Sequence, residues 1–341
     1  MTFMKPIGAF VLAVSLCFAA TAAEEAKKID LPKLKAQYKR PKDIPHPKEN
    51  PYSQAKATLG KALFFDPRLS RSGVMSCATC HNPSFSWGEW HEKGVGDFHK
   101  VLGRKDPTVL NLAWDELYFW DGRADSLEAQ ALGPIEAEGE MNMKLDSAVG
   151  ILKSIKGYRP LFEAAFPGEK EPITKENIGK AIATFERTIV SGEAPFDRWI
   201  KGDEKAISAE AKQGFELFNT KAKCASCHSS WRFSDGSFHD IGLPSKDVGR
   251  GAHLDLAKMK HAFKTVGLRN IDQRAPYMHD GSVKTLEEVV DHYDKGFVKR
   301  PSLSDIITPL GLTPEEKKSL VAFMKTLTSV DAPVTLPILP Q

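Results

Sequence analysis

Four of the five cysteines belong to two copies of a pattern that binds a cofactor covalently. The copies are Cys77-Ala78-Thr79-Cys80-His81 and Cys224-Ala225-Ser226-Cys227-His228. A Cys-x-x-Cys-His run is the attachment motif of c-type haem, because two thioethers hold the porphyrin edge while the adjacent imidazole reaches the iron. The sequence therefore predicts two covalently bound c-type haems, with attachment residues Cys77, Cys80, Cys224 and Cys227 and iron ligands His81 and His228.

A zinc site or a disulfide framework explains the same cysteines less well. A shared zinc ion would require the two Cys pairs to converge, and it would leave both histidines without a use. Disulfides are common in exported proteins, but the spacing here is that of haem attachment. We expect neither.

The first residues have the pattern of a cleaved secretory leader. Lys5 precedes an apolar run from Ile7 to Ala20, which ends at the small-residue site Ala20-Thr21-Ala22. The run is too short to cross a bilayer. We predict a signal peptide at residues 1–23, a periplasmic location and no membrane anchor.

Length and charge bound the organisation of the rest. The chain has 341 residues and a formal net charge of +3, with both signs mixed along it, so no nucleic acid partner is expected. Roughly 318 residues after the leader suggest two domains. We place an extended, solvated, proline-rich arm at 24–50, a first haem domain at 51–195 and a second haem domain at 196–341. The C-terminal helix could pack back on the first domain.

Helical patterns dominate after the arm, and strand signals are few. Apolar residues recur at helical spacing in segments 55–65, 145–155, 178–189 and 211–218, and capping boxes begin helices at Thr285 and Thr313. Residues 192–207 are expected to be turn-rich. The Gly-containing run before each haem motif, at Gly60 and at Gly214, indicates an internal duplication. The expected fold class is all-α, with two cytochrome c-like haem domains in tandem.

Seven runs, in order along the chain, resemble the bacterial dihaem cytochrome c peroxidase and MauG superfamily. They are Leu59 to Ser70, Ser76 to His81, Pro107 to Asn111, Phe119 to Leu127, Glu140-Met141, Leu268 to Asn270 and Ala275 to Gly281. The resemblance covers essentially the whole chain after the arm. It implies that hydrogen peroxide reacts at the first haem, while the second haem relays electrons.

The resemblance also implies catalytic roles for three residues. Glu140 and Gln130 match a distal glutamate and glutamine at the first haem, where Pro134 matches a proline of the pocket. A carboxylate suits this place because peroxide loses a proton from one oxygen and gains one on the other. Trp120 matches a tryptophan between the two haems. The simpler alternatives are a solvated charge for Glu140 and core packing for Trp120.

The sixth ligand of the first haem departs from the reductively activated peroxidases of this superfamily. Those enzymes place a displaceable His after a Val-Gly pair, whereas Val95-Gly96 is followed here by Asp97. We expect an open, MauG-like iron. His99 or His91 as a displaced sixth ligand is the alternative.

The second haem departs in a similar way. Tyr293 falls where the activated peroxidases supply a Met, and MauG-like proteins place a tyrosine there. A phenolate ligand stabilises ferric and higher oxidation states relative to a thioether. Tyr293 is therefore the predicted metal ligand. One alternative is that Tyr293 only packs on the helix face, and another is that Met278 or His292 is the true ligand.

A calcium ion between the domains is doubtful. Members of the superfamily commonly hold one with an Asn after a Gly-Arg pair and with carbonyls of a Thr-x-Pro-Tyr segment. This chain has Gly103-Arg104-Lys105 and Arg274-Ala275-Pro276. Cationic side chains are unfavourable where a hard cation needs oxygen ligands. We expect the site to be absent or altered.

Three functions follow from these residues. The first is a dihaem peroxidase that reduces hydrogen peroxide with electrons from a small periplasmic cytochrome c or cupredoxin. The second is a MauG-like enzyme that uses peroxide to oxidise or crosslink aromatic residues of a partner protein, and Asp97 and Tyr293 favour it. The third is an electron carrier without catalytic activity.

Overall fold

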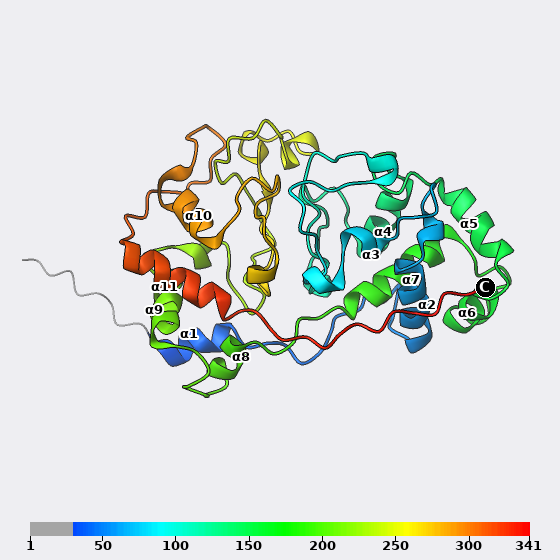
Figure 1. Ribbon diagram of the computed structural model, residues 1–341, viewed down its shortest axis with the longest axis horizontal. Helices are drawn as coiled ribbons and strands as arrows, with labels where there is room; N and C mark the ends of the chain where they lie inside the picture. Colours follow the sequence, from blue (N-terminus) through cyan, green and yellow to red (C-terminus); the bar gives the residue numbers. More distant parts are fainter. Residues whose placement is uncertain (1–29) are drawn as a thin grey trace, which may run out of the picture.

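The computed structural model describes residues 30–341, which form two helical halves lying side by side (Figure 1). The first half contains α2 (Gln54–Phe64), α3 (Cys77–Cys80), α4 (Leu127–Glu136), α5 (Leu145–Ser154), α6 (Tyr158–Ala165) and α7 (Lys175–Arg187). The second half contains α1 (Leu31–Gln37), α8 (Pro195–Ile200), α9 (Ala209–Asn219), α10 (Leu286–Asp291) and α11 (Pro314–Lys325). The predicted signal peptide lies outside the described residues.

Strands are scarce among residues 30–341, and the all-α prediction is confirmed. Strand β1 (Phe238–His239) pairs antiparallel with β2 (Phe263–Lys264), with Phe238 opposite Lys264. A π-helical turn, His292–Gly296, follows α10. Short 3₁₀ helices lie at Pro67–Leu69, Pro83–Phe85, Asp97–His99, Leu112–Trp114, Cys224–Ser226, Arg250–Ala252, Ala257–Met259 and Ile271–Gln273.

The two halves repeat one helix crossing. In the first half α2 packs on α7, and in the second α9 packs on α11. A Cβ at Gly60 of α2 would collide with the carbonyl of Ala181, and a Cβ at Gly214 of α9 with the carbonyl of Ser319. The duplicated glycine of the sequence therefore permits the same close backbone approach in each half.

The arm differs from the prediction of an extended, solvated segment. Residues 31–37 form α1, and Tyr38 after it is only 1% exposed, packed within the second core beside Phe196 and Phe215. The Tyr38 hydroxyl donates to Asn219 Oδ1 at 2.6 Å. Leu31, Leu34 and Tyr38 stand at helical spacing, and this apolar face outweighs the prolines and lysines around it.

Two more segments differ from what the sequence indicated. Helix α8 lies within the passage expected to be turn-rich, where Pro195 starts it and Phe196 and Trp199 anchor it in the core. Helix α11 packs on α9 in the second half, and it is the chain after it that reaches the first half (Figure 1). There Gln341 accepts a hydrogen bond from the Gly157 amide at 2.8 Å.

No helix among residues 30–341 combines the length and the apolar character that crossing a membrane requires. Each half has an apolar core of its own, and a smaller third cluster contains Tyr118, Ala124, Leu127 and Ala183.

Replacing Gly60 or Gly214 by Ala should lower the free energy of unfolding by about 1–3 kcal/mol, because the added methyl group overpacks a helix crossing. Calorimetry of the haem-loaded protein measures the change. Gly150→Ala is the matched control, since no atom lies within 4 Å of a Cβ at this position on α5. Unchanged melting of both crossing variants would contradict the close approach.

Candidate haem sites and the seam between them

The first haem motif lies on a short helix that faces a cavity. Ser76 and Thr79 form a capping box at the start of α3, so Cys77, Cys80 and His81 occupy one helical turn and its end. All four cysteines of residues 30–341 are free of disulfides. Burial lowers the pKa of His81 to about 4, which keeps the imidazole neutral, as iron ligation requires.

The residues predicted at the distal side of the first haem come together with His81. Gln130 and Pro134 stand one turn apart on α4, and Glu140 follows in the loop after it. With His81 they line a cavity of about 540 Å³ and a smaller one of about 40 Å³ that also contacts Cys77 and Cys80. Cationic residues line the larger cavity and suit the carboxylates of a haem: Arg104, Arg123, Arg232, Lys264 and Arg274. The donor set and the space fit a c-type haem.

Glu140 and Gln130 have the properties of reactive groups. Burial raises the pKa of the Glu140 carboxyl, and nearby Arg123 partly opposes this rise. The side-chain oxygen of Gln130 is buried without a hydrogen-bond partner. Both polar groups therefore retain bonding capacity for a small molecule in the cavity.

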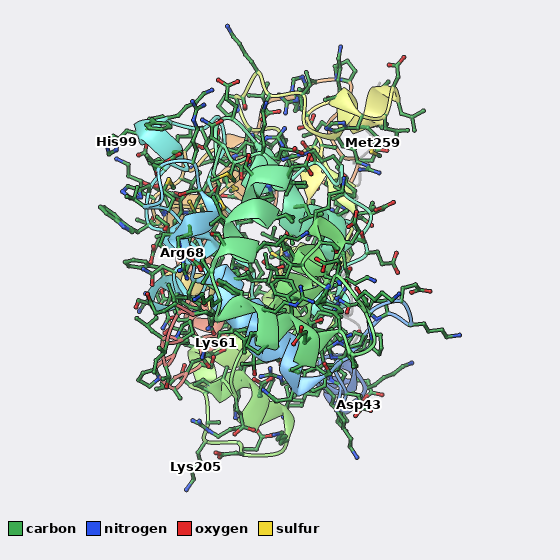
Figure 2. All side chains as sticks on the ribbon, turned by 90° about the vertical axis from the view of Figure 1, so that its right-hand side faces the viewer. Asp43, Lys61, Arg68, His99, Lys205 and Met259 are labelled. Atoms are coloured by element: carbon green, nitrogen blue, oxygen red, sulfur yellow. The ribbon has the colours of Figure 1, made fainter. Side chains whose placement is uncertain are left out.

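The loop that could supply a sixth ligand borders the smaller cavity through Gly96 and Leu102, but Asp97 is not among the residues that line either cavity. Asp97 is 2% exposed and its Oδ2 accepts a hydrogen bond from the Ser72 amide at 3.0 Å. Gly96 packs so closely on Gly139 that a Cβ would collide with its carbonyl. His99 is exposed at the outer edge of the molecule (Figure 2), and His91 is exposed too. Neither histidine is among the residues that line either cavity.

The second haem motif faces an apolar cavity of about 190 Å³. His228 lies beside Cys224 and Cys227 on its wall, and its Nδ1 bonds the carbonyl of Phe233 at 2.8 Å. This contact orients the ring and leaves Nε2 for iron. Burial lowers the pKa of His228, which favours the neutral ligand form.

Tyr293 and Met278 both line this second cavity. Tyr293 is part of the π-helical turn, a distortion that is frequent at functional sites. Burial raises the pKa of its phenol, so the phenolate form needs a nearby cation such as iron. His292 is already engaged, because its Nε2 bonds the carbonyl of Ile241 at 2.9 Å, and it does not line the cavity.

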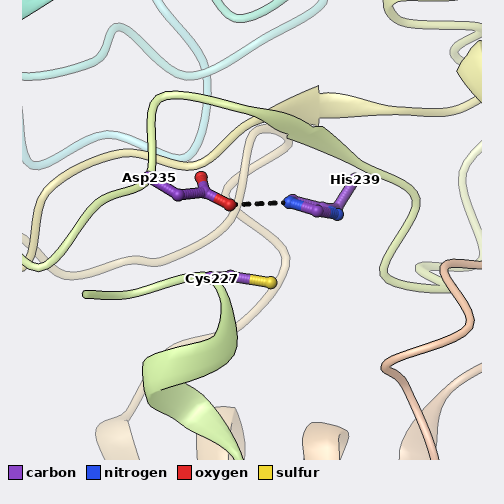
Figure 3. Close-up of side chains that lie close together, drawn as sticks. All are labelled: Cys227, Asp235 and His239. Atoms are coloured by element: carbon purple, nitrogen blue, oxygen red, sulfur yellow. Dashed lines mark hydrogen bonds and ion pairs between the residues drawn. The ribbon is translucent and has the colours of Figure 1, made fainter.

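A cluster of potential metal ligands lies beside the second motif. Cys227, Asp235 and His239 place their ligand atoms within 4.8 Å of one another, and His239 pairs with Asp235 at 3.0 Å (Figure 3). The Cys-x-x-Cys-His motif predicts that the Cys227 sulfur is bonded to the haem, which would leave only Asp235 and His239 of this cluster. The two Cys pairs also lie in different halves, so they do not converge on a zinc ion.

Trp120 stands between the two haem cavities. Its side chain belongs to the walls of both, and its Nε1 donates to the carbonyl of Lys105 at 2.7 Å. The ring of His279, from the second half, lies 6.3 Å from the indole. We call this contact between the halves, formed by Lys105, Trp120 and His279, the seam.

The segments compared with a calcium site carry cations with protein partners. Arg104 pairs with Asp121 at 2.6 Å and with Asp247 at 2.7 Å. Lys105 donates from Nζ to backbone carbonyls, and buried Arg274 donates to the carbonyl of Gly267 at 2.6 Å. Lys105 and His279 both lie in segments that resemble the family, but no sequence pattern predicts that they meet at the seam.

Comparison with known proteins identifies the family. The family described as di-haem cytochrome c peroxidase matches residues 54–205, and cytochrome c matches residues 211–328. The chain is 55% identical to the methylamine utilization protein MauG of Methylorubrum extorquens, over 96% of this chain and 94% of that protein. It is 48% identical to the MauG of Methylophilus methylotrophus, over 97% and 98%.

More distant relatives agree with this assignment. The cytochrome c551 peroxidase of Pseudomonas aeruginosa is 34% identical over 88% of this chain and 86% of that protein. The crystal structure of a MauG-like protein associated with microbial copper homeostasis has a TM-score of 0.78 and 31% identity, covering 85% of this chain and 94% of that one. The chain belongs to the dihaem cytochrome c peroxidase and MauG family. It is a peroxide-using oxidoreductase with two c-type haems in two tandem cytochrome c-type domains, as the sequence predicted.

Metal analysis tests the expectation for calcium. Protein washed with a chelator and dialysed should contain far less than one calcium per chain, because Arg104, Lys105 and Arg274 bring positive charge where the cation would bind. Elemental analysis by mass spectrometry, with iron as the internal standard for protein amount, gives the ratio. One retained calcium per chain would contradict this expectation.

Proposed function

We propose that this protein is a periplasmic, MauG-like dihaem enzyme that uses hydrogen peroxide to oxidise aromatic residues of a partner protein. The observation that carries the proposal is the place of Asp97, whose carboxylate bonds the Ser72 amide while His91 and His99 stay outside the haem cavities. This arrangement favours an iron open to peroxide without prior reduction. The leader-like sequence at residues 1–23 supports the location.

The chemistry at the first site rests on Glu140 and Gln130. When bound, the haem of the first motif supplies an iron that binds peroxide and takes up its two oxidising equivalents. Glu140 accepts the proton from the oxygen nearer the iron and returns it to the departing oxygen, which leaves as water. Gln130 orients the peroxide by hydrogen bonding. Pro134 forms part of the cavity wall beside them.

Trp120 and Tyr293 carry the oxidising power away from the first site. Trp120 lies on the walls of both cavities, so its indole is placed to relay electrons between them. Tyr293 is proposed as the second ligand at the other iron, where a phenolate lowers the reduction potential relative to a thioether. Met278 on the same wall is the competing ligand.

The partner is the least constrained part of the proposal. Two relatives carry the name methylamine utilization protein, at 55% and 48% identity, and we infer a partner protein of methylamine utilisation. The second candidate function, a peroxidase supplied by a small periplasmic cytochrome c or cupredoxin, is favoured by relatives named cytochrome c551 peroxidase at 34% and 35% identity.

Glu140→Gln should slow the reaction with peroxide by about 10²-fold or more, because the amide cannot shuttle a proton. Stopped-flow absorbance of the haem bands measures the rate. Glu138→Gln is the control, since the Glu138 side chain is 85% exposed. A rate unchanged in Glu140→Gln would remove this residue from the mechanism.

The rate should also depend on pH through Glu140. Proton acceptance requires the carboxylate, and burial raises the pKa of this group. The rate should therefore fall as pH decreases through a value above the usual Glu pKa of about 4.3. Glu140→Gln should lack this fall, and a fall that persists in the variant would assign it to another group.

A comparison of electron sources tests the proposed function. The enzyme and peroxide are mixed either with a reduced small cytochrome c or with methylamine-utilisation proteins purified from cells that lack this enzyme. We expect oxygen insertion or loss of hydrogen at aromatic residues of one such protein, detected by peptide mass spectrometry and dependent on peroxide. Rapid turnover with the cytochrome and no modified protein would instead support the peroxidase function.

A further inference from the structure

Lys105 is a buried residue through which three segments of the molecule are joined. It is 7% exposed, and its ammonium donates to the carbonyls of Glu89 at 2.5 Å and His91 at 3.0 Å. Its own carbonyl accepts the Trp120 indole N–H at 2.7 Å. Its amide donates to the carbonyl of His279 in the second half at 2.8 Å. One residue thus contacts a loop of the first half, the inter-haem tryptophan and the opposite half.

The surroundings of Lys105 are built to hold a charge away from water. Glu89 is 5% exposed, and its side chain accepts a hydrogen bond from the Asp106 amide at 2.9 Å. Burial lowers the pKa of Lys105, while the carboxylates of Glu89 and Asp106 oppose that effect and buried Arg274 adds to it. A buried ammonium is tolerated only where such partners compensate its lost hydration.

The same cluster borders Trp120 directly. Glu89, Lys105, Asp106 and Arg274 line a cavity of about 60 Å³ together with Trp120 and Met278. The indole N–H donates to the carbonyl of Lys105, a backbone group that cannot move without moving Lys105 itself. The position of the indole then depends on the position of the Lys105 backbone.

The contacts on the far side of the tryptophan also lead to Lys105. His279 is stacked on Phe263 with ring centroids 3.5 Å apart, and it faces Trp120 edge-on. The His279 backbone is held by the Lys105 amide. The Lys105 ammonium fixes Lys105 to residues 89–91. If this contact is removed, Lys105 no longer holds the Trp120 indole and the His279 backbone in place.

We propose that Lys105 is a positioning residue for electron transfer, whose buried ammonium acts as a built-in cation that fixes Trp120 between the two haems. This inference rests on the proposed relay through Trp120. The positioning of Trp120 depends on the charge and the N–H donors of the Lys105 side chain, and it requires no added ion.

A double-mutant cycle tests the inference without peroxide or a partner protein. The electron-transfer rate between the haems is measured in half-reduced protein after a photochemical pulse, for wild type, Lys105→Met, Trp120→Phe and the double variant. Lys105→Met should slow the transfer about tenfold or more, since small displacements of a positioned group have large effects on rate. In the Trp120→Phe background it should have little further effect, because the two residues act as one unit.

Two controls make the result specific. Lys93→Met removes another lysine of this loop. Its Nζ also donates to a backbone carbonyl, that of Gly103 at 2.8 Å, but Lys93 lines none of the three cavities that Trp120 lines. It should leave the transfer rate unchanged. Iron and haem content per chain must equal wild type in every variant. If Lys105→Met does not load both haems, Lys105→Gln is measured in its place with the same expected outcome.

The outcomes separate this inference from the function on which it rests. If Trp120→Phe leaves the transfer rate unchanged, the relay itself is wrong. If Trp120→Phe slows transfer but the Lys105 variant does not, only the role of Lys105 is overturned. If the Lys105 variant slows transfer equally with Trp and with Phe at position 120, Lys105 acts on the structure at large, and the positioning role is overturned.

Discussion

The two haem sites, one on each half, must be held at a fixed distance from each other. The contact between the halves sets this distance. Electron exchange between them requires this contact to be rigid. Ion pairs provide much of the rigidity: Asp115 of the first half pairs with buried Lys264 of the second at 2.7 Å and also with Arg232, and the partly exposed Arg104 and Asp247 pair with each other. Such pairs are costly to desolvate and costly to break singly, so they specify one arrangement of the halves.

The two halves repeat one fold but carry two different sites. Both halves use the same glycine-mediated helix crossing before the haem motif, so each provides a similar scaffold. The segments that face each scaffold have diverged. In the first half a polar wall of Glu140 and Gln130 adjoins the cavity, whereas in the second half the wall is largely apolar and carries Tyr293. One site suits reaction with a small polar molecule, and the other suits storage and transfer of charge.

The sequence predicted what depends on local patterns. The haem motifs, the capping boxes at Thr285 and Thr313 and the duplicated glycine could all be recognised because each is fixed within a few residues. The sequence pattern did not predict helix α1, because Leu31, Leu34 and Tyr38 form only a short apolar face within a proline-rich segment. The structure shows that the second core covers this face.

The seam could not be predicted for a related reason. The Lys105 ammonium donates to the carbonyls of Glu89 and His91, and its amide donates to the carbonyl of His279. Backbone partners of this kind leave no pattern in side-chain identity. Grouping Glu140, Gln130 and Trp120 required resemblance to a family, because their common cavity is formed by a loop, a helix and a turn that are separate in sequence.

We infer that the sixth coordination position of the first iron is open, and that a ligand other than methionine occupies this position at the second iron. Electron paramagnetic resonance of the fully ferric protein, before and after peroxide is added without any reductant, tests it most directly. We expect one high-spin haem that reacts at once, beside one low-spin haem whose signal lacks the features of methionine ligation. Two low-spin haems that stay inert until the protein is half-reduced would contradict it.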